Sequence, residues 1–132
     1  MNDKHISYYI KDYVEYIKKD FYNYIENTPV DHLPTANLER MKQRFEKSLK
    51  IDRTSSKKYT KIITLNKLFR IPIVHSFILN YDCDRFGKDF KEGDILLPEF
   101  HRQPYYDKIY GNVILKNYVA NWHRPLDLPA NH

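Results

Sequence analysis

The sequence predicts an α+β fold in which two N-terminal helices pack on a small, mainly antiparallel sheet. Three observations carry this prediction. Apolar residues are spaced by three and four along the first 50 residues, they alternate with polar residues from residue 51 onward, and two of the three glycines lie between residues 90 and 125. We expect the 132 residues to form a single domain, with a helical part over 1–50 and a mainly β part over 51–132.

The first helix is predicted from Asp3 to Glu26. Its apolar positions form one stripe, which consists of Ile6, Tyr9, Ile10, Tyr13, Val14, Ile17, Phe21, Tyr24 and Ile25. We expect the helix to end at Asn27-Thr28-Pro29, because the residue before a proline is disfavoured in the α conformation. The tyrosines on and beside the stripe either fill the core with their rings or form an interaction surface.

A second helix is predicted after the connector Pro29–Pro34. Thr35 is a suitable N-cap, since its hydroxyl can accept a hydrogen bond from an amide of the first turn. The buried side of this helix is expected to carry Leu38, Met41, Phe45 and Leu49, which are spaced by three, four and four.

Alternating patterns predict two strands over residues 49–52 and 58–65. The residues between them, 53–57, are polar and short enough for a hairpin loop. On the second strand, alternation places Tyr59 and Lys61 on the same face as Ile63, which we expect to be directed into the core.

The most apolar strand is predicted from Ile71 to Leu79, with both faces covered and with Pro72 either at its start or on an edge. His75 lies within this strand, and we expect it to be a hydrogen-bonded core histidine. Residues 81–92 are interpreted as a polar excursion that leads to a short strand over 95–97. Residues 112–120 are expected to form a last strand or a short helix, and periodicity does not separate the two.

The segment from Phe90 to Pro125 is expected to be fixed in shape. Gly93 and Gly111 are predicted to hold turns, because glycine is the residue that adopts positive φ without strain. The only tryptophan, Trp122, is expected to be buried against the first helix or the sheet, since a lone indole in a short domain anchors packing.

The net charge of +5 is unevenly distributed along the chain. Residues 35–70 contain eleven basic and three acidic residues, an excess of eight positive charges that can attract a polyanion. The predicted nucleic-acid-binding residues are Arg53, Lys57, Lys58, Lys61, Lys67 and Arg70. Tyr59 either stacks on an unpaired base or packs inward. The alternative interpretation is a basic face that only contacts solvent.

No pattern in the sequence predicts catalysis, a metal or a cofactor. The six histidines do not form a His-x-x-x-His pair, and the single cysteine, Cys83, cannot form an internal disulfide. A lone cysteine and the absence of a signal-like opening segment favour a reducing cytosolic compartment. No apolar run approaches the roughly 20 residues that a membrane span requires.

Five motifs follow one another in the second half of the chain: Tyr59-Thr60-Lys61-Ile62, Val74-His75-Ser76-Phe77, Gly93-Asp94-Ile95-Leu96, Gly111-Asn112 and Trp122-His123-Arg124-Pro125. In this order they resemble a group of short bacteriophage proteins, over residues 57–128. Those proteins often carry an aromatic-x-x-Pro-Ala stretch and an arginine before Gly-Asn, where this chain has 100–104 and Tyr110. The resemblance implies a phage origin and a role in host takeover, genome handling, counter-defence or virion assembly.

Two functions are therefore predicted. The first is a small, non-catalytic phage accessory protein that binds nucleic acid through its basic middle segment. The second is a protein–protein interaction module, either a virion component or an inhibitor of a host or defence protein, in which the tyrosines and the final segment form the interface. The expected location is the cytoplasm of the infected bacterium, or the virion. The sequence leaves the oligomeric state open.

Overall fold

The computed structural model describes residues 3–27, 38–65, 71–100 and 102–128. Two helices precede the strands, α1 (Asp3–Glu26) and α2 (Leu38–Ser48). The strands are β1 (Lys50–Asp52), β2 (Tyr59–Leu65), β3 (Pro72–Leu79), β4 (Cys83–Arg85), β5 (Lys88–Phe90), β6 (Ile95–Leu96), β7 (Pro98–Glu99) and β8 (Gln103–Pro104). The predicted α+β fold is confirmed. The proposed N-cap Thr35 lies outside the described residues.

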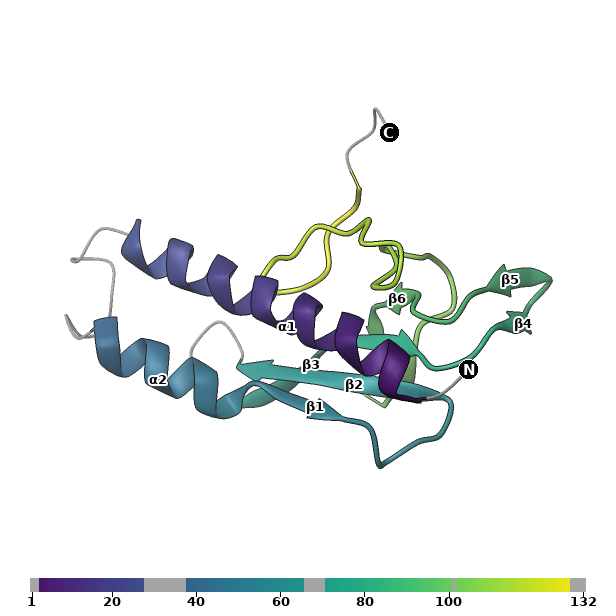
Figure 1. Ribbon diagram of the computed structural model, residues 1–132, viewed down its shortest axis with the longest axis horizontal. Coiled ribbons are helices and arrows are strands. Elements are labelled where there is room, and N and C mark those ends of the chain that lie inside the picture. The colour runs from purple at the N-terminus through teal and green to yellow at the C-terminus, as the bar shows by residue number, and fades with distance from the viewer. Residues whose placement is uncertain (1–2, 28–37, 66–70, 101, 129–132) are drawn as a thin grey trace.

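The main sheet has the strand order β1-β2-β3-β6, and every neighbouring pair is antiparallel. Figure 1 shows α1 crossing in front of β2 and β3, with α2 beside α1 at the end of the sheet where β1 begins. The predicted hairpin between β1 and β2 is confirmed, as is the position of Pro72 at the start of β3.

The core between the helices and the sheet contains most of the predicted helical stripes, but Tyr24 of the first stripe is 43% exposed and lies outside this core. Its α1 residues are Ile6, Ile10, Tyr13, Val14, Ile17, Phe21 and Ile25, joined by Met41 and Phe45 of α2. The rings of Phe21 and Phe45 stack with centroids 3.9 Å apart, which joins the two helices. The sheet contributes Ile62 and Ile78, whereas Ile63 is only half-buried on the other face. The expectation that Ile63 enters the core is therefore wrong.

A β-bulge interrupts β3 at His75. Ile62 pairs with Ser76 and Ile63 pairs with Val74, so His75 is the extra residue and the alternation along β3 shifts by one position. Both His75 and Ser76 consequently reach Tyr13 of α1, through a ring contact and a hydrogen bond respectively. The predicted hydrogen-bonded core histidine is confirmed, because its two ring nitrogens bond Ser76 Oγ and the Asn121 carbonyl.

Two small hairpins lie at one end of the sheet, where β7 and β8 contact β3 and the β4–β5 hairpin projects away from the sheet (Figure 1). One pairs β4 with β5, and the other pairs β7 with β8. Leu79, Phe90 and Leu96 form a second buried cluster there. Residues 81–92, interpreted from the sequence as a polar excursion, thus contain a hairpin, which Phe90 anchors because its ring is buried at the end of β5.

Residues 110–112 pair with the chain at β6 and extend the sheet there, but they do not form a regular strand. Ile95 N donates to Gly111 O and Tyr110 N to Ile95 O, and an isolated bridge joins Asp94 with Asn112. Neither a strand nor a helix spans 112–120, which corrects the prediction. The Asn112 side chain accepts hydrogen bonds from the amides of Ile114 and Leu115, and this local bonding folds the chain into a turn.

Trp122 closes the core between the two helices. Its side chain is 7% exposed, and its ring lies 5.2 Å from that of Phe21 and 6.1 Å from that of Phe45. The Trp122 amide donates to the Asp20 carboxylate of α1 over 2.8 Å. The predicted burial against the first helix is confirmed. Among the described helices, none is both long and apolar enough to cross a membrane.

Candidate nucleic-acid interface

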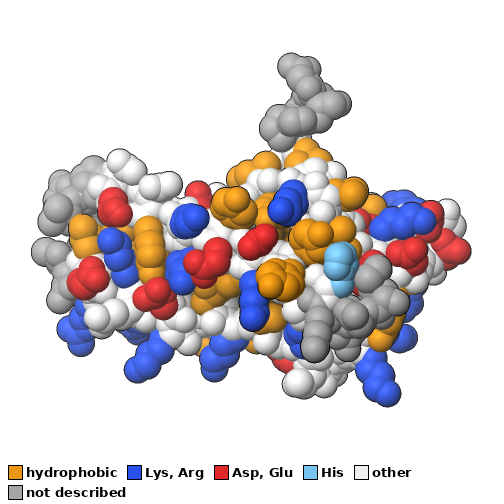
Figure 2. Space-filling view, viewed as in Figure 1, with side chains coloured by type: hydrophobic (Ala, Val, Ile, Leu, Met, Phe, Trp, Pro, Cys, Tyr) orange, Lys and Arg blue, Asp and Glu red, His pale blue; other side chains and the backbone are white. Residues whose placement is uncertain are grey.

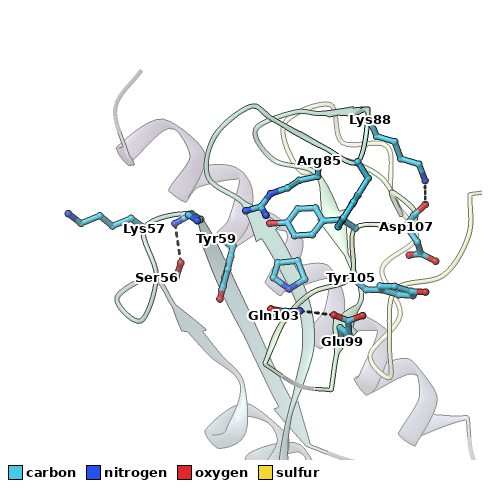
Figure 3. A pocket seen from close by; sticks show the side chains of 13 residues that line it. Ser56, Lys57, Tyr59, Arg85, Lys88, Glu99, Gln103, Tyr105 and Asp107 are labelled. Carbon is cyan, nitrogen blue, oxygen red and sulfur yellow. Dashed lines mark hydrogen bonds between the residues drawn. The ribbon is translucent and has the colours of Figure 1, made fainter.

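A pocket of about 820 Å³ lies where the β1–β2 loop, the β4–β5 hairpin and residues 99 and 103–107 meet (Figure 3). Four basic residues line it, Lys57, Lys58, Arg85 and Lys88. Its aromatic residues are Tyr59, Phe86, Tyr105 and Tyr106, and its acidic residues are Glu99 and Asp107. A cationic pocket with several aromatic rings is the combination that single-stranded nucleic acids require.

Hydrogen bonds within the β1–β2 loop hold the first part of the pocket. The Asp52 carboxylate accepts hydrogen bonds from the backbone amides and the side-chain hydroxyls of Thr54 and Ser55. These bonds fold the loop back on β1. These donors also lower the pKa of Asp52. The loop therefore has a defined shape at the end of β1.

Asn80 fixes the position of the two lysines. Its side-chain amide donates to Lys57 O over 3.1 Å, and its backbone amide donates to Lys58 O over 2.9 Å. The Asn80 oxygen accepts from the buried Thr60 hydroxyl. The backbone of Lys57 and Lys58 is thereby attached to the end of β3, while their side chains are exposed.

The β4–β5 hairpin supplies the other two cations. The Arg85 guanidinium lies 4.9 Å from the centroid of the Tyr106 ring, which restricts its direction. Burial raises the pKa of Tyr106, and the Arg85 charge acts in the opposite direction. Lys88 Nζ donates to the Asp107 carbonyl over 2.8 Å, so the hairpin is tied to the final segment.

Phe86 occupies the tip of this hairpin in an unusual backbone conformation. Its φ is +54° and that of Gly87 is +76°, and both values lie in the left-handed region. A bulky residue is strained there, whereas glycine is not. The Phe86 side chain is 85% exposed, although burying it would be favourable. An exposed aromatic ring at a strained position is a feature of functional sites.

A carboxylate and an amide form the opposite wall. Gln103 Nε2 donates to Glu99 Oε1 over 2.6 Å, across the β7–β8 pair. In Figure 3 these two side chains lie together on one side of the pocket, with Arg85 and Lys88 on the other. Glu99 thus lies apart from Arg85 and Lys88, whereas the second carboxylate of the pocket, Asp107, lies beside Lys88.

The predicted binding residues lie at different places in the structure. Lys57 and Lys58 line the pocket together with Tyr59, whose ring packs 4.9 Å from Phe77. Arg53 lines a neighbouring shallow recess, and its guanidinium bonds the Ser7 hydroxyl. Lys61 is half-buried on the same face of β2 as Ile63, and it does not line the pocket.

Lys67 and Arg70 lie outside the described residues. The sequence reasoning missed Arg85, Lys88 and the tyrosines at 105 and 106. The signal available in the sequence for this hairpin was Gly87, a turn-forming residue in the middle of residues 83–90.

A second basic surface lies on α2. Arg40, Arg44 and Lys47 line a shallow recess there with Gln43 and Glu46. Figure 2 shows Lys and Arg side chains in a row along the lower edge of this view, where Figure 1 places α2 and β1. None of the described residues that line this recess is aromatic, so they offer charge without stacking.

Further titratable residues lie outside this pocket, and His75 and Tyr13 are among them. Within the parts of the chain that the structure describes, no three His, Cys, Asp or Glu residues are grouped to hold a metal ion. Tyr13 and His75 each form a hydrogen bond with the Ser76 hydroxyl, but all three residues are buried in the core. Comparisons of the chain with protein-family models, curated proteins and solved structures find no match.

Proposed function

We propose that this chain is a small, non-catalytic phage accessory protein that binds single-stranded nucleic acid in the pocket between the β1–β2 loop and the β4–β5 hairpin. One observation carries the proposal: four cationic side chains and an exposed aromatic ring line the same pocket. The cations neutralise phosphates while the ring stacks on an unpaired base. The phage origin is taken from the order of sequence motifs, and it implies action in the infected cell.

Duplex binding is less well supported by this geometry. A duplex is read by a helix or a two-stranded ribbon that enters a groove. The basic residues of α2 form a flat helical face, but the proposed pocket is concave and lined by aromatic rings, which need unstacked bases. We therefore expect the protein to bind single strands more tightly than duplexes of the same sequence.

Binding of a fluorescent 12-nucleotide single strand, measured by anisotropy over a salt series, tests the proposal. Four neutralised phosphates give a slope of log K against log salt of roughly −3. Lys57→Glu with Lys58→Glu should weaken binding by more than about tenfold, because the reversed charges repel phosphate. Arg44→Glu with Lys47→Glu changes the net charge equally on α2 and should have much less effect. Equal losses in the two variants would contradict the assignment to the pocket.

A second candidate function is a protein-interaction module, and exposed apolar side chains favour it. Tyr8, Phe100 and Leu115 are 76%, 84% and 70% exposed. Figure 2 shows apolar side chains gathered over the middle of the molecule, where α1 meets the final segment. A pulldown from infected cells with and without nuclease separates the two candidates. A protein that stays bound after nuclease treatment, in high salt, supports the module.

A further inference from the structure

The Glu99 carboxylate lies apart from the cations of the pocket, and this position restricts the ligand. Lys57, Lys58, Arg85 and Lys88 line the pocket with Asp107 beside Lys88, and Glu99 with Gln103 forms a wall on another side. A phosphate is attracted to the lysines and the arginine and repelled by Glu99. The wall at Glu99 therefore meets the uncharged part of a nucleotide, which is its base.

The wall at Glu99 is rich in hydrogen-bond acceptors. Glu99 Oε1 accepts from Gln103 Nε2, and within the described parts of the chain no other donor to the two side chains is present. Glu99 Oε2 and Gln103 Oε1 are thus available as acceptors, and a carboxylate can accept two parallel hydrogen bonds. The base that fits this wall must present two neighbouring donors on one edge.

Guanine is the base with that edge. Its ring N1–H and its exocyclic amine at N2 point in the same direction, so a carboxylate accepts both. Adenine, cytosine and uracil place an acceptor next to their donor on the pairing edge, and that acceptor would face a carboxylate oxygen. Single-stranded recognition proceeds through such exposed edges.

We propose that the pocket binds a guanine nucleotide unit, with its base on Glu99 and its phosphate among Lys57, Lys58, Arg85 and Lys88. The volume of about 820 Å³ is in the range of small-molecule sites, so one or two nucleotides fit. This inference rests on the proposed function, because it uses the same cations for phosphate. The unit is either part of a strand or a free nucleotide, and both present the same edge.

The test uses 9-nucleotide strands of thymidine that differ only in the central base. Guanine at the centre should bind about tenfold more tightly than adenine, cytosine or thymine. Hypoxanthine at the centre lacks the N2 amine and should lose most of this preference. Guanosine monophosphate and adenosine monophosphate, added as competitors, distinguish the sources. Selective displacement by the guanosine compound identifies a free nucleotide as a ligand, and selectivity among strands alone identifies a strand.

Two variants with the same change of charge locate the preference. Glu99→Gln replaces an acceptor with an amide and should remove the preference for guanine while the thymidine strand still binds. Asp107→Asn changes the other carboxylate of the pocket and should keep the preference for guanine. The hydrogen bond from Lys88 goes to the backbone carbonyl of Asp107, so this substitution does not remove it. Strands that bind with equal affinity regardless of the central base would overturn the inference and leave the proposed function intact. Failure of every strand to bind would overturn both.

Discussion

The Asn112 side-chain amide donates a hydrogen bond to the Asp94 carboxylate over 2.9 Å, in the interior of the protein. The same amide donates to the Glu92 carbonyl, and the Asn112 oxygen accepts from two amides of the following turn. The Asp94 carboxylate also accepts from the Lys91 amide. The pair of Asp94 and Asn112 side chains thus joins the turn at Gly93 to the turn after Gly111. In the sequence these are two separate motifs, Gly93-Asp94 and Gly111-Asn112.

Replacing Asn112 with alanine should destabilise the protein by about 2–4 kcal/mol. The substitution leaves two backbone amides without their acceptor and removes a donor from a buried carboxylate. Chemical denaturation of the two proteins measures the difference. Asn23→Ala on the exposed side of α1 is the control, and it should change the free energy of unfolding by about 0.5 kcal/mol or less. Equal effects of the two substitutions would contradict the structural role of Asn112.

The three glycines should differ in their tolerance of substitution. All three have positive φ, so alanine is strained at each, by about 1 kcal/mol. A Cβ at Gly87 meets no atom within 4 Å, but at Gly93 it would lie 2.8 Å from Asn112 Oδ1, and at Gly111 2.3 Å from the Asn117 carbonyl oxygen. We expect the loss of stability to increase in the order Gly87→Ala, Gly93→Ala, Gly111→Ala.

Valine at Gly93 should be worse than alanine, since a branched side chain at positive φ adds to the contact with Asn112. Thermal melts of the alanine series and of Gly93→Val check this order. A Gly111→Ala protein that melts like the wild type would show that the backbone of the final segment shifts freely.

Protonation of His75 should make the fold unstable in acid. Its ring is neutral, because Nε2 must donate to the Asn121 carbonyl and Nδ1 therefore accepts from the Ser76 hydroxyl. Burial lowers the pKa of His75 from 6.5 to about 4. The unfolded chain binds a proton below pH 6.5 and the folded protein does not, so stability should fall from pH 6.5 to pH 4 by roughly 3 kcal/mol.

A variant isolates this contribution from that of the other groups. Burial raises the pKa of Asp94, which favours the folded state in acid and acts against His75. His75→Gln lowers stability at every pH, but the decrease between pH 6.5 and pH 4 should be smaller than in the wild type. Urea titrations at both pH values provide the comparison. Identical decreases in the two proteins would show that His75 does not titrate in this range.

The sequence predicts the elements of this fold better than the way they meet. The stripes from Ile6 to Ile25 define α1 because helical spacing is a local property. The bulge at His75 accompanies a ring contact with Tyr13, which lies 62 residues earlier, and no local periodicity predicts that contact. Lys57 and Lys58 were predicted from local charge alone. Arg85 and Tyr106 join them only because the β4–β5 hairpin and the residues after β8 meet the β1–β2 loop in the folded chain, so the pocket is a tertiary feature.

Phe86 should reduce the stability of the protein and strengthen its binding of nucleic acid. Its φ of +54° suits asparagine better than phenylalanine, so Phe86→Asn should stabilise the fold by about 1 kcal/mol. The same change removes a ring from the pocket and should weaken binding of a single strand by about 1–3 kcal/mol. Thermal melting and anisotropy titration on one preparation measure the two effects.

Phe100 provides the matched control for this prediction. It has a φ of +53° and is 84% exposed, but it does not line the pocket. Phe100→Asn should therefore stabilise the fold by a similar amount and leave the affinity for nucleic acid unchanged. A loss of affinity in both variants would mean that the two rings contact the ligand together. A gain in stability without any loss of affinity in Phe86→Asn would remove the stacking role, because the strain at Phe86 would then have no counterpart in binding.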